Sequence, residues 1–215
     1  KAVPSLVVEA VWGFFSVYII VFGLMLLAMM STGLDQVTAF SAVAATLNQR
    51  LAPGFGPFWG HPHGHAYDGL TTKKPAIGHE RRLIEQRVTQ AKAVWQLNGA
   101  GSVGGQVLMG LPRLLALRND PRLATQTRVW PFETGLTAPE VAAGDIVIAE
   151  IYPSLVAPDP REPITDAGQV QAVANHLAEA DKAGTLAAMF SAPDLSAAER
   201  RAVETEEAWI LGVAA

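Results

Sequence analysis

The chain of 215 residues contains no cysteine, which excludes disulfides and thiolate metal sites. It also lacks a basic excess, since 16 lysines and arginines are set against 20 aspartates and glutamates, for a formal net charge of -4. Tight generic binding to nucleic acid needs a basic stripe, and this balance argues against it. An acidic, metal-dependent nuclease site stays compatible with the composition.

Charge is absent from the stretch between Glu9 and Asp35. Residues 10–30 are apolar on every face, and a bilayer-spanning helix needs about 20 such residues. The run is longer than the apolar part of a signal peptide, and its flank is acidic rather than basic. We therefore expect a membrane helix, with the membrane as a partner through residues 10–30. After it, Gly33 and Asp35 predict the end of one helix and the cap of a second, short one.

Three stretches in this region, Val7–Phe15, Gly33–Asp35 and Thr38–Asn48, resemble the last membrane repeat of Trk/Ktr-type potassium transporters. The resemblance covers about residues 1–48 and implies that the second helix is a pore helix leading to a selectivity filter. The chain departs from that family directly after Asn48. A cation filter needs carbonyl oxygens from four such loops, and the neighbouring Arg50 would repel the ion, so transport activity is not carried over.

Residues 51–76 are rich in glycine and proline and are expected to form loops. Within them the alternating His61, His63 and His65 could bind zinc, copper or nickel, or could belong to a solvated loop. The following segment, His79–Val88, has the spacing of a helix with one apolar face. Its arginines could contact phosphate or form a solvated face.

A glycine-rich corner follows, in which Gly99, Gly101 and Gly104 fit the G-x-G-x-x-G spacing of a dinucleotide site. With Ser102 they are the candidate cofactor-binding residues, because such a corner directs backbone N–H groups toward an anion at a helix start. The alternative is a tight structural turn. The sequence lacks an acidic residue at the end of a second strand, at the spacing from the glycines that is typical of dinucleotide-binding proteins.

Further along, 128–135 predicts a short strand and 144–154 the best strand of the chain. Glu150 lies at the end of that strand, where burying a carboxylate is costly unless it binds something. The alternative is an exposed strand end. The tail predicts helices over 167–183, 185–190 and 197–213, the last opened by a capping box between Ser196 and Glu199.

From about residue 49 to the end the chain is similar to a bacterial family of unknown function whose members are predicted RNase H-like nucleases. Some members carry names linked to molybdopterin guanine dinucleotide synthesis. The likeness rests on Gly56–Gly60, Ala93–Leu97, Gly99–Gly104, Arg128–Gly135, Ala149–Ser154 and Glu206–Gly212.

That resemblance implies a carboxylate site around magnesium, which would activate a water against a phosphodiester. It implies Glu150, Glu206, Glu207 and Glu133 as catalytic candidates, with Glu150 and Glu206 as metal ligands. The family pattern opens with an aspartate on the first strand, which this chain lacks. We therefore expect weak catalysis or none.

The predicted fold class is α/β: an incomplete RNase H-like mixed sheet with flanking helices, preceded by a long apolar transmembrane-type helix and a short pore-type helix. The expected domains are a membrane helix with a pore-like helix (1–48), a loop with a charged helix (49–92) and an RNase H-like core (93–215). A start without methionine suggests an internal piece of a longer protein.

The main functional prediction is an impaired hydrolase of the RNase H type, acting on a nucleotide or nucleic acid. The alternatives are a potassium-transporter fragment, a chimera of the two families with no intact activity, and a dinucleotide-binding protein through Gly99–Gly104. The protein is expected at the membrane if residues 1–48 are native to it, and otherwise in the cytoplasm.

Overall fold

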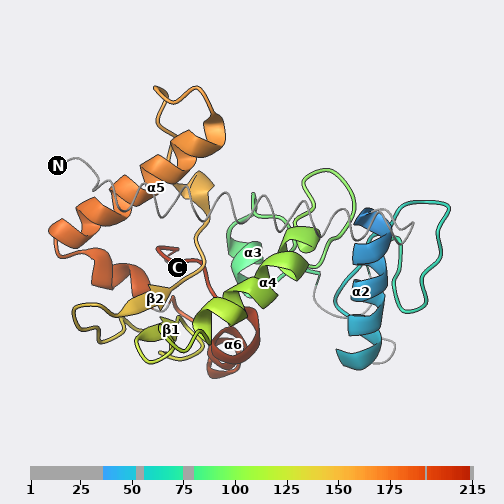
Figure 1. Cartoon of the computed structure of the whole chain (residues 1–215), viewed down its shortest axis with the longest axis horizontal. Helices are drawn as coiled ribbons and strands as arrows, with labels where there is room; N and C mark the ends of the chain where they lie inside the picture. Colours follow the sequence, from blue (N-terminus) through green and yellow to red (C-terminus); the bar gives the residue numbers. More distant parts are fainter. Residues whose placement is uncertain (1–35, 52–55, 75–79, 192, 214–215) are drawn as a thin grey trace. The chain divides into compact units, whose positions relative to one another are not determined.

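The computed structural model describes residues 36–51, 56–74, 80–191 and 193–213. Short helices and two strands follow one another along these ranges (Figure 1). In chain order they are α2 (Gln36–Leu51), α3 (Leu83–Arg87), α4 (Gly104–Arg118), β1 (Thr127–Val129), β2 (Ile146–Ile148), the 3-10 turn η1 (Pro153–Leu155), α5 (Thr165–Lys182), the 3-10 turn η2 (Leu186–Phe190), α6 (Ala197–Ala202) and the π-helical turn η3 (Val203–Glu207).

The chain divides into two compact units. The first comprises residues 1–80 and 95–108, and the second comprises residues 81–94 and 109–215. Each unit has its own cluster of buried apolar side chains among the described residues. The bounds of these units differ from those of the predicted domains 1–48, 49–92 and 93–215. The domain division itself stays a prediction.

The first unit is held together by a buried asparagine at the end of α2. The Asn48 amide nitrogen donates to the carbonyl oxygens of Phe58 and Gly69, each at 2.8 Å, and its amide oxygen accepts from the Phe58 N–H at 3.0 Å. Ala44 of α2, Phe58 and Leu70 form the apolar cluster beside it. The amide therefore fastens the following loop to the helix, because it satisfies backbone groups that have no helix or strand partner.

The second unit has a larger core, built from segments far apart in the sequence. Trp130 packs edge-to-face on Phe190 with ring centroids 5.6 Å apart, an arrangement that aromatic pairs prefer. Its most deeply buried apolar side chains come from α3, the turn after β1, η3 and the C-terminal segment; they are Ile84, Trp130, Leu136, Val203, Trp209 and Ile210.

The sheet corrects the predicted fold class. In the described part of the chain it consists of β1 and β2 alone, paired in parallel with Thr127 opposite Ile146 and Val129 opposite Ile148. The expected strand over 144–154 keeps its ladder only from Ile146 to Ile148, after which Glu150 makes an isolated bridge to Ile210. The RNase H-like mixed sheet is therefore wrong, since two strands of three residues do not make one.

The membrane part of the fold prediction also needs correction. Residues 10–30, where the long apolar helix was expected, lie outside the described residues. Among the helices that the structure does describe, none is long and apolar enough to cross a membrane. The second expected helix corresponds to α2, which runs on to Leu51.

The last predicted helix is shorter than expected. Its capping box is present, because the Glu199 N–H donates to the Ser196 hydroxyl oxygen and the Ser196 N–H donates to the Glu199 carboxylate. The helix ends at Glu207 rather than at 213, since Ala208 adopts a φ of 62°, which is costly for a residue with a side chain. This reversal sends Trp209 and Ile210 into the core.

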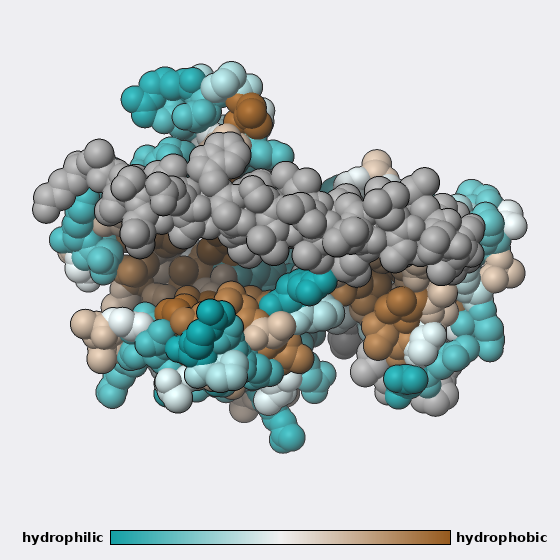
Figure 2. All heavy atoms as spheres, in the orientation of Figure 1, coloured by the Kyte–Doolittle hydropathy of each residue, from teal (hydrophilic) through white to brown (hydrophobic). Residues whose placement is uncertain are grey.

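The middle of α4 carries apolar side chains at the surface. Leu111, Leu115 and Leu117 are 58%, 61% and 50% exposed, and Figure 2 shows apolar atoms at the surface over the region of α4. The helix continues through Pro112. An exposed apolar run on one helix is a candidate contact surface.

Truncating a core side chain is expected to be far more costly than truncating one of these exposed leucines. Leu136→Ala removes a side chain that is 1% exposed, and such a cavity lowers the free energy of unfolding by about 2–5 kcal/mol. Leu115→Ala is the matched control and is expected to cost less than about 0.5 kcal/mol. Denaturant unfolding followed by tryptophan fluorescence measures both, and similar midpoints would contradict the core assignment.

Candidate functional site

A buried arginine lies at the centre of the charged residues of the second unit. Arg82, directly before α3, is 7% exposed. Its two terminal nitrogens contact the two carboxylate oxygens of Glu150 at 2.8 and 2.7 Å. Its Nε donates to Glu85 at 2.8 Å. This two-point pairing of a guanidinium with a carboxylate is the strongest geometry that such groups form.

The Glu85 carboxylate accepts hydrogen bonds at the start of α3, the helix to which it belongs. It is fully buried and also accepts from the Arg82 and Val94 N–H groups, at 3.1 and 3.2 Å. A carboxylate three residues into a helix satisfies N–H groups that have no partner along the helix. Glu85 therefore tolerates burial because its oxygens face an arginine and two backbone donors.

The C-terminal segment joins the same residues through Glu207. Its carbonyl oxygen accepts from the Arg82 guanidinium at 2.8 Å, and its carboxylate accepts from the Leu83 N–H at 2.7 Å. The four residues Arg82, Glu85, Glu150 and Glu207 are called the Arg82 cluster below. They connect the start of α3, the end of the β2 segment and the end of η3.

The charge balance of the Arg82 cluster keeps the arginine ionised. Burial by itself lowers the pKa of Arg82, but the hydrogen bonds and charges of Glu150 and then Glu85 outweigh it and raise the pKa above the ordinary value. A buried cation is stable only when opposite charges and acceptors surround it. The cluster therefore acts as a fixed ion-pair network.

Two of the predicted catalytic residues, Glu150 and Glu207, thus lie together, but around an arginine. A magnesium site needs carboxylate oxygens that are free to face an ion. Both oxygens of Glu150 instead face Arg82, and one oxygen of Glu207 faces a backbone N–H. In the described ranges no group of three His, Asp or Glu side chains could hold a metal. Magnesium binding stays an untested prediction.

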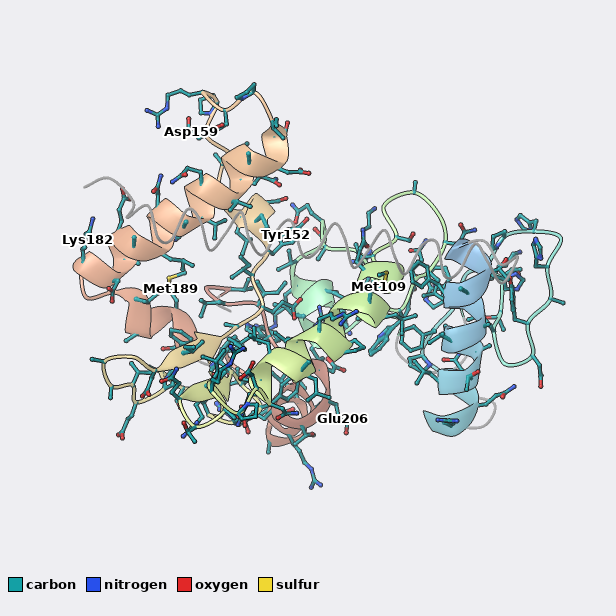
Figure 3. All side chains as sticks on the ribbon, in the orientation of Figure 1. Met109, Tyr152, Asp159, Lys182, Met189 and Glu206 are labelled. Carbon is teal, nitrogen blue, oxygen red and sulfur yellow. The ribbon has the colours of Figure 1, made fainter. Side chains whose placement is uncertain are left out.

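The other two candidates are elsewhere in the second unit. Glu206 is exposed and lies at the outer side of the C-terminal helical segment (Figure 3). Glu133 accepts from Arg118 at 2.8 Å and from the Val129 N–H at 2.7 Å, so it ties α4 to the turn after β1. The hydrogen bond from Arg118 is the main reason why the pKa of Glu133 is lowered.

The glycine-rich corner forms a tight turn at the start of α4. Gly99 and Gly101 have φ of 117° and 74°, a backbone conformation that favours glycine. The Ser102 N–H donates to the Gly99 carbonyl at 3.1 Å, and the Gly104 N–H donates to the Gln96 carbonyl at 2.9 Å. These N–H groups are therefore engaged within the turn itself. Dinucleotide binding at this corner stays untested.

The histidine motif belongs to the first unit and is partly buried. His61 is 7% exposed, and its ring meets the Tyr67 ring edge-on at a centroid distance of 5.3 Å. His65 stacks on Tyr67 at 6.3 Å, while His63 is exposed. Among the described residues these histidines do not form a group of three that could hold a metal, and His61 packs on Tyr67.

Sequence reasoning missed Arg82 and Glu85, the residues that organise the cluster. Both lie in the segment 79–88, which was interpreted as a phosphate-binding or solvated face. An available signal was the three-residue spacing of Arg82 and Glu85 on either side of an apolar pair, Leu83–Ile84, which suits a helix start. Nothing in the sequence indicated that Glu150, 68 residues away, would be the partner.

Removing the arginine is expected to destabilise the second unit strongly. Arg82→Leu leaves Glu85 and Glu150 without their counter-charge, and breaking such a buried pair costs about 3–5 kcal/mol. Arg122→Leu is the control, because its pair with Asp120 is exposed and such pairs contribute about 0–1 kcal/mol. Urea unfolding compares the two, and adding Glu85→Gln and Glu150→Gln to Arg82→Leu is expected to restore part of the loss. An equal loss in both single variants would overturn the cluster's role.

The pair between Glu133 and Arg118 predicts a measurable pH effect. With Arg118→Met the pKa of Glu133 is expected to rise toward its ordinary value, because the lowering hydrogen bond is gone. Since the pKa is lowered in the folded chain, the pair stabilises the fold above the ordinary pKa, and this contribution is lost as the pH falls through the lowered one. NMR titration of the Glu133 carboxyl carbon measures the shift, with Arg201→Met as the control. An unchanged titration curve in Arg118→Met would refute the assignment.

Comparison with known proteins identifies relatives for one segment of the chain. No protein-family profile matches the sequence, and no solved structure matches it either. The RNase H-like resemblance of residues 49–215 is therefore not supported.

Curated relatives that match the chain carry the description "Trk system potassium uptake protein TrkH", among them the following three. The protein from Vibrio parahaemolyticus is 58% identical over 56 residues, which are 26% of this chain and 11% of that protein. The one from Halomonas elongata is 53% identical over 60 residues, 28% of this chain and 12% of that protein. The one from Escherichia coli K12 is 52% identical over 56 residues, with shares of 26% and 11%.

The chain thus spans about a ninth of the length of the curated relatives it matches. The predicted resemblance of a segment of this chain to Trk-type potassium transporters is confirmed.

Proposed function

We propose that this protein is membrane-associated and that its Trk-like segment makes the contact with the bilayer. The observation that carries the proposal is the identity of 52–58% over 56 residues with proteins described as potassium uptake proteins. Transporters of ions work within a membrane, and more than half of the 56 aligned residues are identical to those of the potassium uptake proteins. The uncharged stretch between Glu9 and Asp35 agrees with this.

The proposal covers attachment rather than potassium transport by this chain. A potassium filter takes its carbonyl oxygens from four loops. The matched segment is only 11–12% of the relatives' length. The end of α2 is also occupied, because the buried Asn48 amide fastens it to Phe58 and Gly69. In this proposal the segment is a transporter fragment that anchors the chain.

The arrangement of the acidic residues favours this proposal over a nuclease. Both oxygens of Glu150 are engaged by Arg82, Glu133 is engaged by Arg118, and Glu206 is exposed by itself. No observation on the described residues favours a nucleotide or nucleic-acid substrate. The contacts of Glu133, Glu150 and Glu207 account for these three carboxylates as contributions to folding.

Charging the apolar stretch is expected to release the chain from membranes. Each arginine at the centre of such a stretch costs about 2.5–3.5 kcal/mol on insertion, so Leu24→Arg combined with Leu26→Arg is expected to move the full chain from floated liposomes to the unbound fraction. Ile164→Arg combined with Val170→Arg is the matched control, since both side chains are exposed in the second unit. Flotation of the purified, detergent-exchanged chain measures binding.

Two results would contradict the proposal. One is an unmodified chain that stays unbound with every liposome. The other is equal binding of the two double variants.

A further inference from the structure

Two exposed apolar regions in the second unit are candidates for contact with something outside it. One is the middle of α4, where Leu111 and Leu115 are exposed and Leu114 is partly buried; these three residues are called the α4 leucine surface below. Leu111 and Leu115 are one helical turn apart and share a face. A shallow hollow along this face is lined by Leu111, Pro112, Leu114, Leu115 and Arg118. The other region is at the start of α5, where Ile164 and Val170 are 65% and 67% exposed.

The charge around the two regions differs in sign. The segment from 104 to 133 contains four arginines against two acids, and both acids pair with an arginine of the same segment, Asp120 with Arg122 and Glu133 with Arg118. The segment from 159 to 182 instead contains five acidic residues against one arginine and one lysine; the acids are Asp159, Glu162, Asp166, Glu179 and Asp181. An anionic surface would therefore attract the first region and repel the second.

We propose that the α4 leucine surface lies on the headgroup region of an anionic bilayer. This inference rests on the proposed membrane association and adds a second contact, separate from the Trk-like segment. A helix with leucines on one face, arginines and no acidic residue can lie in the plane of the interface, with its leucines among the acyl chains. The four arginines exceed the two acids of the segment 104–133, and this net positive charge contributes attraction to anionic lipids.

The helix is placed to do this without unfolding. The core does not use Leu111 and Leu115, because both are more than half exposed while the core of the second unit is filled by other side chains. The arginine at its end is held in place, since Arg118 also donates to the Ala124 carbonyl at 3.0 Å. The α4 leucine surface is thus presented by a fixed element.

The absence of cysteine makes a direct test available. A single cysteine at Leu115→Cys in the full chain is labelled with the polarity-sensitive probe nitrobenzoxadiazole, and Val170→Cys on α5 is the matched control. Each labelled chain is reconstituted into phosphatidylcholine vesicles with or without phosphatidylglycerol. Emission maxima and quenching by spin-labelled lipid report whether the probe enters the bilayer.

The expected result is a blue shift and strong lipid quenching at position 115 in vesicles with phosphatidylglycerol. A smaller effect is expected in vesicles of phosphatidylcholine alone. The probe at position 170 is expected to keep water-like emission in both kinds of vesicle. Leu111→Asn in the labelled Leu115→Cys chain is expected to reduce the shift, because one leucine transfer contributes about tenfold to partitioning.

Three results would overturn the inference. Water-like emission at position 115 in chains that co-float with vesicles refutes the second contact and leaves the proposed attachment standing. Chains that never co-float refute both proposals. Shielding of position 115 without vesicles, together with a dimer in light scattering, assigns the α4 leucine surface to a second copy of the chain instead.

Discussion

The second unit depends on a single guanidinium group placed among carboxylates that would otherwise repel one another. Arg82 contacts Glu85 in its own helix start, Glu150 after β2 and the carbonyl of Glu207 at the end of η3. Each of these partners belongs to a different segment, and the buried carboxylate of Glu85 is stable only with such a cation beside it. The core of Ile84, Trp130 and Trp209 closes around the segments that this network brings together.

The same network explains why acidic residues that look catalytic in the sequence have a structural role here. A partly buried carboxylate at the end of a strand needs a partner, and Glu150 finds one in Arg82. Glu133 likewise finds Arg118 and the Val129 N–H. In both cases an arginine donates hydrogen bonds to the carboxylate oxygens that a metal-dependent enzyme would need for its metal ion.

The two proposals connect the two kinds of apolar surface in this chain. The Trk-like segment is similar to part of a family of potassium uptake proteins, and the α4 leucine surface belongs to the described second unit. A bilayer could bind both surfaces, because it solvates apolar side chains whose exposure to water costs free energy. The acidic residues around α5 would instead be repelled by an anionic bilayer.

The sequence by itself determined the local features, and the tertiary structure decided which charges meet. The Trk resemblance, the glycine turn before α4, a helix over the Thr38–Asn48 stretch and the capping box of Ser196 with Glu199 all depend on residues close together in the chain. Such features follow from backbone preferences and short spacings. The sheet was overestimated, because alternation over 144–154 does not reveal how many strands pair. The partnership of Arg82 with Glu150 spans 68 residues, and only packing brings two such groups together.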